Sequence, residues 1–579
     1  MPYQTSSNDT EEYKCQDNPP QLLNIFHFRF LSIGALVSLM VIELSVILWL
    51  NYDHSIPCWD TAAHRINSLT IYDLLQNPLP QHLSWWQDIF GVSPLYPPLI
   101  YLINGSLKLV LGRHADTEAL VNLLFVALMF VATYYGAYFS CNKKGTPLIA
   151  AVLVFLYPWV YWSTHNVLLD CSANAMVAVA LCLFLWWDIK PLTWKSVFLG
   201  ITFGLTALTK NNTPLFLAGP ILISAILSVT QRDFKRLCQT GLIVLFAGFT
   251  VLPWLILAGA KVSDYISSIQ QQDFGISERL TNLLQNFSTF AFHDLPMILS
   301  PLLFICLIIS IANPIYFNRK KAYLLASIIF SICLASVFRW PHQLRYIVPA
   351  AIPIAILTSD MFASLWEKKL WSKKELALQA ILILILSISI FQLLYSAFIP
   401  YPLALPQSLL KPADKVMTFL GVSNLITNEN HNPQGISFLP LPRADWGAFW
   451  VLSIIAKESH GKSTKLMIMP NTDTVSCSPY IYLEKLNNQH INNIMCLNGR
   501  DYTVNGDLVH FDPTYARTIN WYVLKTGQQG IPLSDQASKE AYAQWHEFVR
   551  SSGEFRLAGK RQLPDNSLLE LYRRRHSCS

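Results

Sequence analysis

The sequence predicts an α-helical polytopic membrane protein with a soluble α/β domain at its C-terminal end. Of its 579 residues, 52% are hydrophobic and only 13% are charged, about half the charged share of a soluble globular protein. Apolar stretches separated by polar joints recur through residues 31–399, whereas residues 400–579 have the composition of an ordinary soluble domain. This pattern excludes a cytosolic enzyme and a disordered protein.

The charges and the cysteines exclude two further classes. Lys and Arg number 42 against 36 Asp and Glu, and the net charge of +6 is too small over this length to predict a nucleic-acid partner. The 11 Cys lack the short spacings of a zinc site and are too sparse for a disulfide scaffold. The partner that the composition does predict is a lipid bilayer.

A helix needs roughly 17–25 apolar residues to cross a bilayer core of about 30 Å, so we expect about eleven transmembrane helices. No cleavage pattern follows the first apolar stretch, which is expected to remain as an anchor behind a cytoplasmic tail of residues 1–30. The membrane domain is then residues 31–399, and an extracytoplasmic α/β domain covers residues 400–579. The expected spans are residues 31–50, 118–140, 147–162, 171–187, 196–209, 214–229, 241–260, 295–317, 322–338, 346–365 and 376–399.

The basic residues of the joints decide whether one further apolar stretch, residues 94–111, crosses the membrane. Cytoplasmic loops are enriched in Lys and Arg near the helix ends. If residues 94–111 do not cross, most basic residues of the short joints fall on one side, so we expect an interfacial or re-entrant helix within a first outer loop of residues 51–117. The basic residues on the predicted inner side are Lys143, Lys144, Lys190, Lys195, Arg232, Lys235, Arg236, Arg319, Lys320, Lys321, Lys368, Lys369, Lys373 and Lys374.

The same alternation places two acids on the outer face. Asp60 lies in the outer loop soon after the first span, and Asp170 lies where a short outer joint returns into the membrane. A carboxylate at the membrane surface can accept a proton from a hydroxyl or amine nucleophile, and an acid at membrane depth is costly unless it serves a function. Helix capping is the structural alternative for both acids.

Two cations share this face. Lys210 ends the segment Gly204–Lys210, and Arg345 precedes Tyr346. Lys acts as a point charge towards a phosphate and Arg as a bidentate fork, although each could instead snorkel to lipid head groups.

Together these features resemble the polytopic glycosyltransferases of the GT-C fold, in particular the protein mannosyltransferase and aminoarabinose transferase branch. The resemblance rests on their order: a span, an outer-loop Asp, a Pro-Pro-Leu stretch, a second outer Asp, then GLxxLTK and RYxxPxxxP. It implies that Asp60 acts as the catalytic base or positions it, and that Asp170 supports the site. It also implies that Lys210, Arg345 and Tyr346 lie near the phosphate of a lipid-linked donor. Many relatives have Glu after the first Asp, where this chain has Thr61.

The reaction implied by the resemblance is an inverting displacement at the anomeric carbon of a polyprenyl-phosphate sugar. The acceptor is a protein, lipid or glycan on the outer face. Because Lys and Arg can stabilise the leaving phosphate, we expect no cofactor, with a divalent metal as the alternative. His64, Tyr96 and His165 are expected to form part of the substrate wall, and the outer histidines lack a metal-ligand spacing. We favour a bacterial inner membrane as the location.

Two other functions stay open on the sequence alone. One is a transporter or flippase, which tends to show repeated halves and broken helices at mid-membrane. The other is a non-catalytic GT-C relative, which the missing second carboxylate beside Asp60 keeps possible.

The C-terminal domain shows alternating strand and helix patterns without a catalytic constellation. Cys477 and Cys496 could pair if this domain faces an oxidising compartment. The expected strands are residues 465–469, 491–496, 521–525, 555–561 and 567–572, and the expected helices are residues 446–458 and 536–551.

Overall fold

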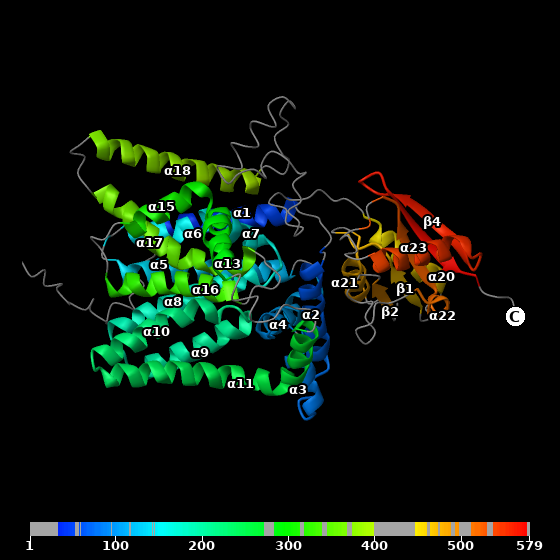
Figure 1. Ribbon diagram of the computed structural model, residues 1–579, viewed down its shortest axis with the longest axis horizontal. Coiled ribbons are helices and arrows are strands. Elements are labelled where there is room, and N and C mark those ends of the chain that lie inside the picture. Colours follow the sequence, from blue (N-terminus) through cyan, green and yellow to red (C-terminus); the bar gives the residue numbers. More distant parts are fainter. Residues whose placement is uncertain are drawn as a thin grey trace, which may run out of the picture.

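The computed structural model shows a helical bundle followed by a smaller sheet domain (Figure 1). Three helices of the predicted first outer loop cross one end of the bundle, and the sheet domain lies beyond them. The structure describes residues 33–398, with gaps at 53–56, 58, 94, 115–116, 142, 144, 271–282, 313–317, 338–343 and 368–372. It also describes residues 446–575, with gaps at 460–463, 473–474, 488–492, 497–510, 528 and 530–535. The predicted boundary between residues 399 and 400 lies outside the described residues.

Each of the predicted spans overlaps a helix of the bundle. Within the described part of the chain, five helices are long and apolar enough to cross a membrane, or seven if each of two bent pairs is one span. The figure of about eleven crossings therefore remains a prediction. The bundle helices are α1 (Ile33–Tyr52), α5 (Thr117–Ser140), α6 (Thr146–Leu156), α7 (Pro158–His165), α8 (Asp170–Ile189), α9 (Thr193–Thr209), α10 (Pro214–Thr230), α11 (Phe234–Gln270), α13 (Leu283–Thr289), the π-helix η2 (Phe290–Asp294), α14 (Leu295–Leu299), α15 (Pro301–Ala312), α16 (Arg319–Val337), the 3₁₀ turns η4 (Leu344–Tyr346) and η5 (Val348–Ala350), α17 (Ala351–Glu367) and α18 (Lys373–Phe398).

Two predicted spans are broken by a proline. Tyr157 is extended between α6 and α7 because Pro158 disfavours a helical residue before it, and the two helices meet at 71°. The stretch before Pro301 also breaks, but with a different backbone: Ser300 has a φ of 70°, and the chain bends by 118° between α14 and α15. The predicted span 147–162 therefore contains a break at Tyr157, and the described part of the predicted span 295–317 contains one at Ser300.

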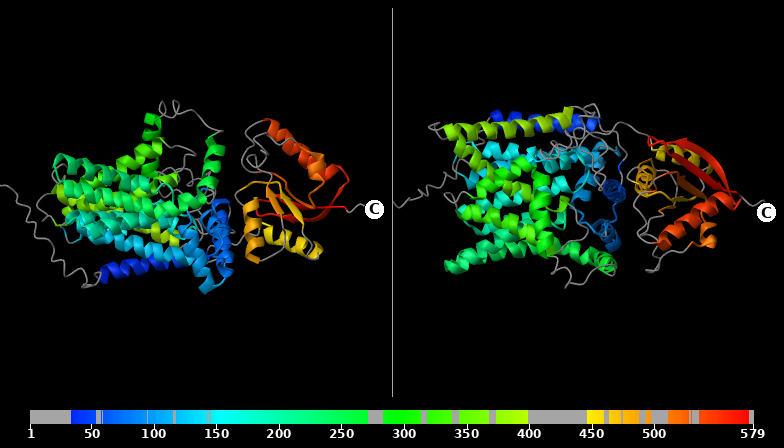
Figure 2. Two further views of the ribbon diagram at one scale, coloured as in Figure 1. Left: turned by 90° about the horizontal axis from the view of Figure 1, so that it is seen from below. Right: turned by 45° about the horizontal axis from the view of Figure 1, so that its top comes forward.

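The predicted first outer loop contains three helices, α2 (Trp59–Gln76), α3 (Leu83–Phe90) and α4 (Leu99–Leu111). In Figure 2 they run across the end of the bundle. The 13 residues of α4 span about 20 Å, which is shorter than a bilayer core of about 30 Å. The interfacial or re-entrant placement of residues 94–111 stays a prediction. Gly105 lets α4 lie against α2, since a Cβ there would stand 2.5 Å from Cγ2 of Ile71.

The C-terminal domain is a mixed sheet with helices, and the expected strands and helices are all present. The strand order is β2-β1-β3-β5-β4, with β1 parallel to β2 and β3 and with β5 antiparallel to β3 and β4. The sequence patterns did not predict α21. The elements are α20 (Ala448–Ser459), β1 (Lys465–Ile468), α21 (Cys477–Asn487), β2 (Asn493–Cys496), α22 (Pro513–Ala516), β3 (Trp521–Lys525), α23 (Gln536–Ser551), β4 (Phe555–Gln562) and β5 (Leu568–Arg574).

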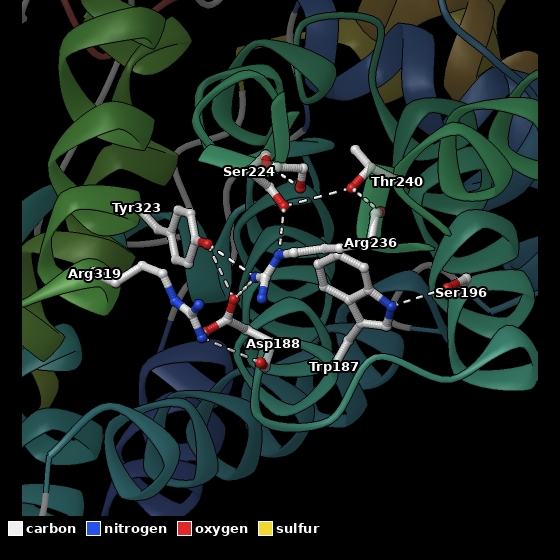
Figure 3. A network of polar contacts seen from close by, with 9 residues as sticks. Trp187, Asp188, Ser196, Ser224, Arg236, Thr240, Arg319 and Tyr323 are labelled. Carbon is white, nitrogen blue, oxygen red and sulfur yellow. Dashed lines mark hydrogen bonds and ion pairs between the residues drawn. The ribbon is translucent and has the colours of Figure 1, made fainter. Parts of the chain in front are cut away.

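Helix α8 has a buried acid near each end. Asp170 begins the helix, and Asp188 lies about 27 Å further along it. Figure 3 shows that the Asp188 carboxylate accepts hydrogen bonds from Arg236, from Arg319 at 3.0 Å and from the Tyr323 hydroxyl at 3.0 Å. This network ties together the ends of α8, α11 and α16.

A second group of ion pairs connects α17 to two segments rich in basic residues, the loop before α6 and the start of α16. The Asp360 carboxylate lies 3.0 Å from Nζ of Lys143 and 2.8 Å from Nζ of Lys321. Since Lys321 follows Arg319 closely in α16, this group lies towards the Asp188 end of the bundle, where the alternation of joints predicts the cytoplasmic side.

Candidate active site

The site begins with an ion pair between the outer loop and the segment before α17. Asp60 lies in the first turn of α2, and Arg345 lies in η4. A carboxylate oxygen of Asp60 accepts a hydrogen bond from Nη2 of Arg345. The Arg345 side chain is 10% exposed and that of Asp60 is 48% exposed, so the acid remains open to an incoming molecule while its partner is largely covered.

A second, fully covered ion pair lies beside the first. Nζ of Lys210, just after α9, donates to the Asp170 carboxylate at 2.8 Å, and both side chains are only 3% exposed. The Tyr346 ring joins the two pairs, because its centroid lies 5.4 Å from Nζ of Lys210 and 5.9 Å from Cζ of Arg345. We call Asp60, Asp170, Lys210 and Arg345 the four-charge cluster; with each group ionised, its formal charge is zero.

Polar contacts of the backbone hold the cations in place. Asn212 donates to the carbonyl oxygen of Tyr346 at 3.0 Å, which fastens the Lys210 loop to the Arg345 segment. The hydroxyl of Thr213 donates to the carbonyl oxygen of Lys210 at 2.8 Å. Sequence reasoning missed both residues, although each follows Lys210 within three positions.

The structure brings His64 and Tyr96 together beside Asp60. His64 follows Asp60 by one turn of α2, and its Nδ1 shares a hydrogen bond of 2.7 Å with the Tyr101 hydroxyl. The rings of His64 and Tyr96 meet edge to face at 5.1 Å. These residues form an aromatic wall next to Asp60.

His165 lies elsewhere among the described residues. Its ring stacks on Trp49 at 3.9 Å and meets Tyr161 edge to face at 5.2 Å. It is buried, and no contact found in the described chain joins it to the four-charge cluster. The helix break at Pro158 redirects α7, which the hydropathy pattern could not indicate.

The cluster sets the protonation states of its members. Burial alone would raise the pKa of Asp60, but the charge and hydrogen bond of Arg345, with help from Lys210, outweigh it and hold the pKa below its usual value. Burial lowers the pKa of His64 to about 4, so its imidazole is neutral at pH 7. For Arg345, the two neighbouring carboxylates outweigh burial and raise the pKa of the guanidinium.

A metal site is not built by these residues. In the parts of the chain that the structure describes, no group of three or more His, Cys, Asp or Glu is arranged to hold a metal ion. The arrangement instead offers an ionised carboxylate next to two cations, which suits proton removal beside a developing anion.

Comparisons with known proteins bear on the family and on the fold. Residues 97–265, which include Asp170 and Lys210, match the family model for dolichyl-phosphate-mannose-protein mannosyltransferase. No curated protein sequence matches the chain.

Among solved structures, ArnT from Cupriavidus metallidurans is similar over nearly the whole length. In the apo state it has a TM-score of 0.56 at 11% identity, with 93% of this chain and 97% of that chain covered. Bound to undecaprenyl phosphate it has a TM-score of 0.53 at 12% identity, with the same coverage. The chain therefore has the GT-C membrane fold of the protein mannosyltransferase and ArnT type.

Proposed function

We propose that the protein is a membrane glycosyltransferase that transfers a sugar from a polyprenyl-phosphate donor to an acceptor on the extracytoplasmic face. The observation that carries this proposal is the four-charge cluster, in which a half-exposed carboxylate lies against a covered cation. The match of residues 97–265 to a mannosyltransferase family and the similarity to ArnT support the same chemistry.

Asp60 is the base in this mechanism. A hydroxyl or amine of the acceptor attacks the anomeric carbon of the donor sugar, and its proton passes to the Asp60 carboxylate. The bond between the anomeric carbon and the phosphate oxygen breaks, and its electron pair stays on that oxygen. Attack from the face opposite the phosphate inverts the anomeric centre.

Arg345 links the two halves of this step. While Asp60 is ionised, Arg345 is its partner. When Asp60 takes the proton, Arg345 loses that anionic partner in the same step in which the leaving phosphate gains negative charge. Arg345 and Lys210 can then stabilise the phosphate in a covered site, where such interactions are stronger than in water. The chemistry needs no metal.

The finer assignments also belong to this proposal. The carrier is undecaprenyl phosphate, which the similar ArnT structure binds, and the location is a bacterial inner membrane. Cys477 is disulfide-bonded, and because disulfides persist in oxidising compartments, this supports an extracytoplasmic C-terminal domain. The acceptor is a protein, lipid or glycan that reaches Asp60 from that side.

The two alternatives are less favoured. A transporter would gather its polar groups at broken helices near mid-membrane, whereas the four-charge cluster lies at one end of α8 and beside α2. A non-catalytic relative has no need of an ionised Asp60 opposite Arg345.

The test is incubation of the purified protein with a panel of polyprenyl-phosphate sugars while released lipid phosphate and glycosylated acceptor are measured. We expect release with at least one donor, and loss of that release in Asp60→Asn. A folded protein that releases lipid phosphate from none of these donors contradicts the proposal.

A further inference from the structure

Helix α2 has two functional faces. Asp60, His64 and Ser68 recur at intervals of four and share one side of the helix. That side meets Arg345 and Tyr101, and Ser68 accepts a hydrogen bond of 3.2 Å from Asn104 in α4. This face belongs to the active site.

The opposite face belongs to the core of the C-terminal domain. Ala62 and Leu69 are fully buried, and they form one apolar cluster with residues of α20, α21 and the sheet, among them Leu452 and Tyr480. At 100° per residue, Ala62 and Leu69 lie about 180–200° around the helix from Asp60. A helix that carries the candidate base thus completes the core of another domain.

Polar contacts fix the register of this interface. Nζ of Lys485 donates to the Thr70 hydroxyl at 2.6 Å, and it lies 3.9 Å from the Asp73 carboxylate. Arg65 reaches Tyr482, with 3.5 Å between Nη1 and the hydroxyl and 5.7 Å between Cζ and the ring centroid.

A third basic residue closes the interface. Nη2 of Arg113 donates to the carbonyl oxygen of Lys485 at 2.6 Å, and Nη1 lies 3.0 Å from the Asp73 carboxylate. The contacts between α21 and α2 extend to Asp73, which lies about 20 Å from Asp60 along the axis of α2. A small tilt of α2 there moves Asp60 relative to Arg345.

We propose that the C-terminal domain positions the base of the active site, with Lys485 and Tyr482 of α21 as positioning residues that hold α2 against the bundle. The inference rests on the proposed function only in naming Asp60 as the base. Because catalysis depends on the placement of reacting groups to within about 1 Å, with losses of the order of a hundredfold beyond that, undocking α21 lowers turnover without touching the substrate.

Three variants test the hydrogen bond between Lys485 and Thr70. Lys485→Ala removes the amine, Thr70→Val removes its acceptor at nearly constant volume, and Lys485→Arg keeps a cation at the same place. The control is Arg517→Ala, which breaks an exposed ion pair with Glu554 at 2.9 Å in the same domain, away from α21.

We expect kcat to fall roughly ten- to a hundredfold in Lys485→Ala, with a smaller fall in Thr70→Val and no further fall in the double variant. Lys485→Arg recovers most of the activity, and KM for the donor changes little. The acid limb of the pH profile of kcat moves to higher pH. Asp60 then lies further from the cations Arg345 and Lys210, which lower its pKa in the wild-type protein. Arg517→Ala leaves all of these unchanged.

A second measurement does not depend on activity. Hydrogen exchange of the α2 amides is expected to speed up in Lys485→Ala and to stay at the wild-type rate in Arg517→Ala. Unchanged α2 exchange together with an unchanged kcat and pH profile in Lys485→Ala overturns the inference. So does a loss of activity that merely follows the folded fraction, without the pH shift. An inactive wild-type protein whose α2 exchange still responds to Lys485→Ala overturns the proposed function instead.

Discussion

Asp60 and Arg345 are 285 positions apart in the chain, and the carboxylate of one accepts a hydrogen bond from the guanidinium of the other. The first turn of a loop helix and the segment before α17 are thereby held together at one end of the bundle. Lys210 and Asp170 form the neighbouring pair at 2.8 Å. Opposite charges from four separate segments thus converge on the place where a proton and a phosphate would have to be handled together.

Asp60→Asn is expected to lower transfer by about a hundredfold or more, because the amide cannot accept the acceptor's proton. Asp88→Asn is the matched control, since Asp88 is an acid of the same outer loop with a 61% exposed side chain. Lipid-phosphate release is measured for both variants at equal folded protein. An equal loss of lipid-phosphate release in both variants would show that Asp60 is not the catalytic base.

The pH dependence of transfer should report on the Asp60–Arg345 pair. Because Arg345 holds the pKa of Asp60 below its usual value, kcat/KM is expected to stay level as the pH falls through the ordinary carboxyl range near about 4. In Arg345→Gln, burial acts unopposed by that cation and the acid limb moves to higher pH. The contribution of Asp60 to folding stability has the same sign: it is present above the unfolded pKa and is lost as the pH falls through the lower folded pKa. An identical acid limb in both proteins would contradict the pairing.

The buried pair Lys210–Asp170 should behave as a unit in stability. Lys210→Met removes the 2.8 Å partner of the covered Asp170 carboxylate and leaves only the more distant charge of Arg345 facing it, which costs about 3–5 kcal/mol. Asp170→Asn strands Lys210 in the same way. In the double variant neither charge remains, so we expect most of the stability to return while donor binding stays weak. Thermal unfolding of the three variants measures the coupling, and simple additivity would show that the two residues act independently.

At the other end of α8, Asp188→Asn should destabilise the protein without altering its chemistry. The variant leaves the guanidinium of Arg236, buried in the network of Figure 3, without its carboxylate. We expect a loss of about 3–5 kcal/mol in unfolding free energy and an unchanged KM for the donor. A changed donor KM at constant stability would point to a role in the reaction.

Labelling of introduced cysteines tests the sidedness. Lys190 directly follows the last residue of α8, and Asn211 lies two positions after the end of α9. Both are exposed, and because α8 and α9 are consecutive predicted spans, the two residues are expected on opposite sides of the membrane. In a chain whose exposed Cys238 and Cys333 are changed to Ser, Lys190→Cys should react only from the cytoplasm and Asn211→Cys only from the outside. Reaction of both from one compartment would remove the basis for a single outer active site.

Part of this site could be predicted from the sequence because membrane topology restricts the choices. Once the basic joints are assigned to one side, Asp60, Asp170, Lys210 and Arg345 must share the other, and the structure brings these four together. Which acid meets which cation depends on packing between distant helices, and so it could not be predicted. The same holds for His165, which a proline break turns onto Trp49.

The docking of α21 on α2 lies further beyond sequence reasoning. Lys485 and Thr70 are 415 positions apart, and nothing in the local pattern of either segment indicates the other. The central C-terminal strands were predictable because short apolar runs indicate buried strands, and β3 (Trp521–Lys525) is buried at each of its positions. What that sheet domain packs against is decided by long-range shape, which periodicity does not encode.

The two charged ends of α8 also limit the membranes in which the protein can work. Its 20 residues measure about 30 Å, close to the thickness of an average hydrocarbon core. In a thicker bilayer, either an ionised end of the helix would lie inside the hydrocarbon core or the bilayer would have to become thinner around the protein. Each ångström of this hydrophobic mismatch costs free energy. Activity should therefore pass through an optimum as the acyl chains of the host lipid are lengthened.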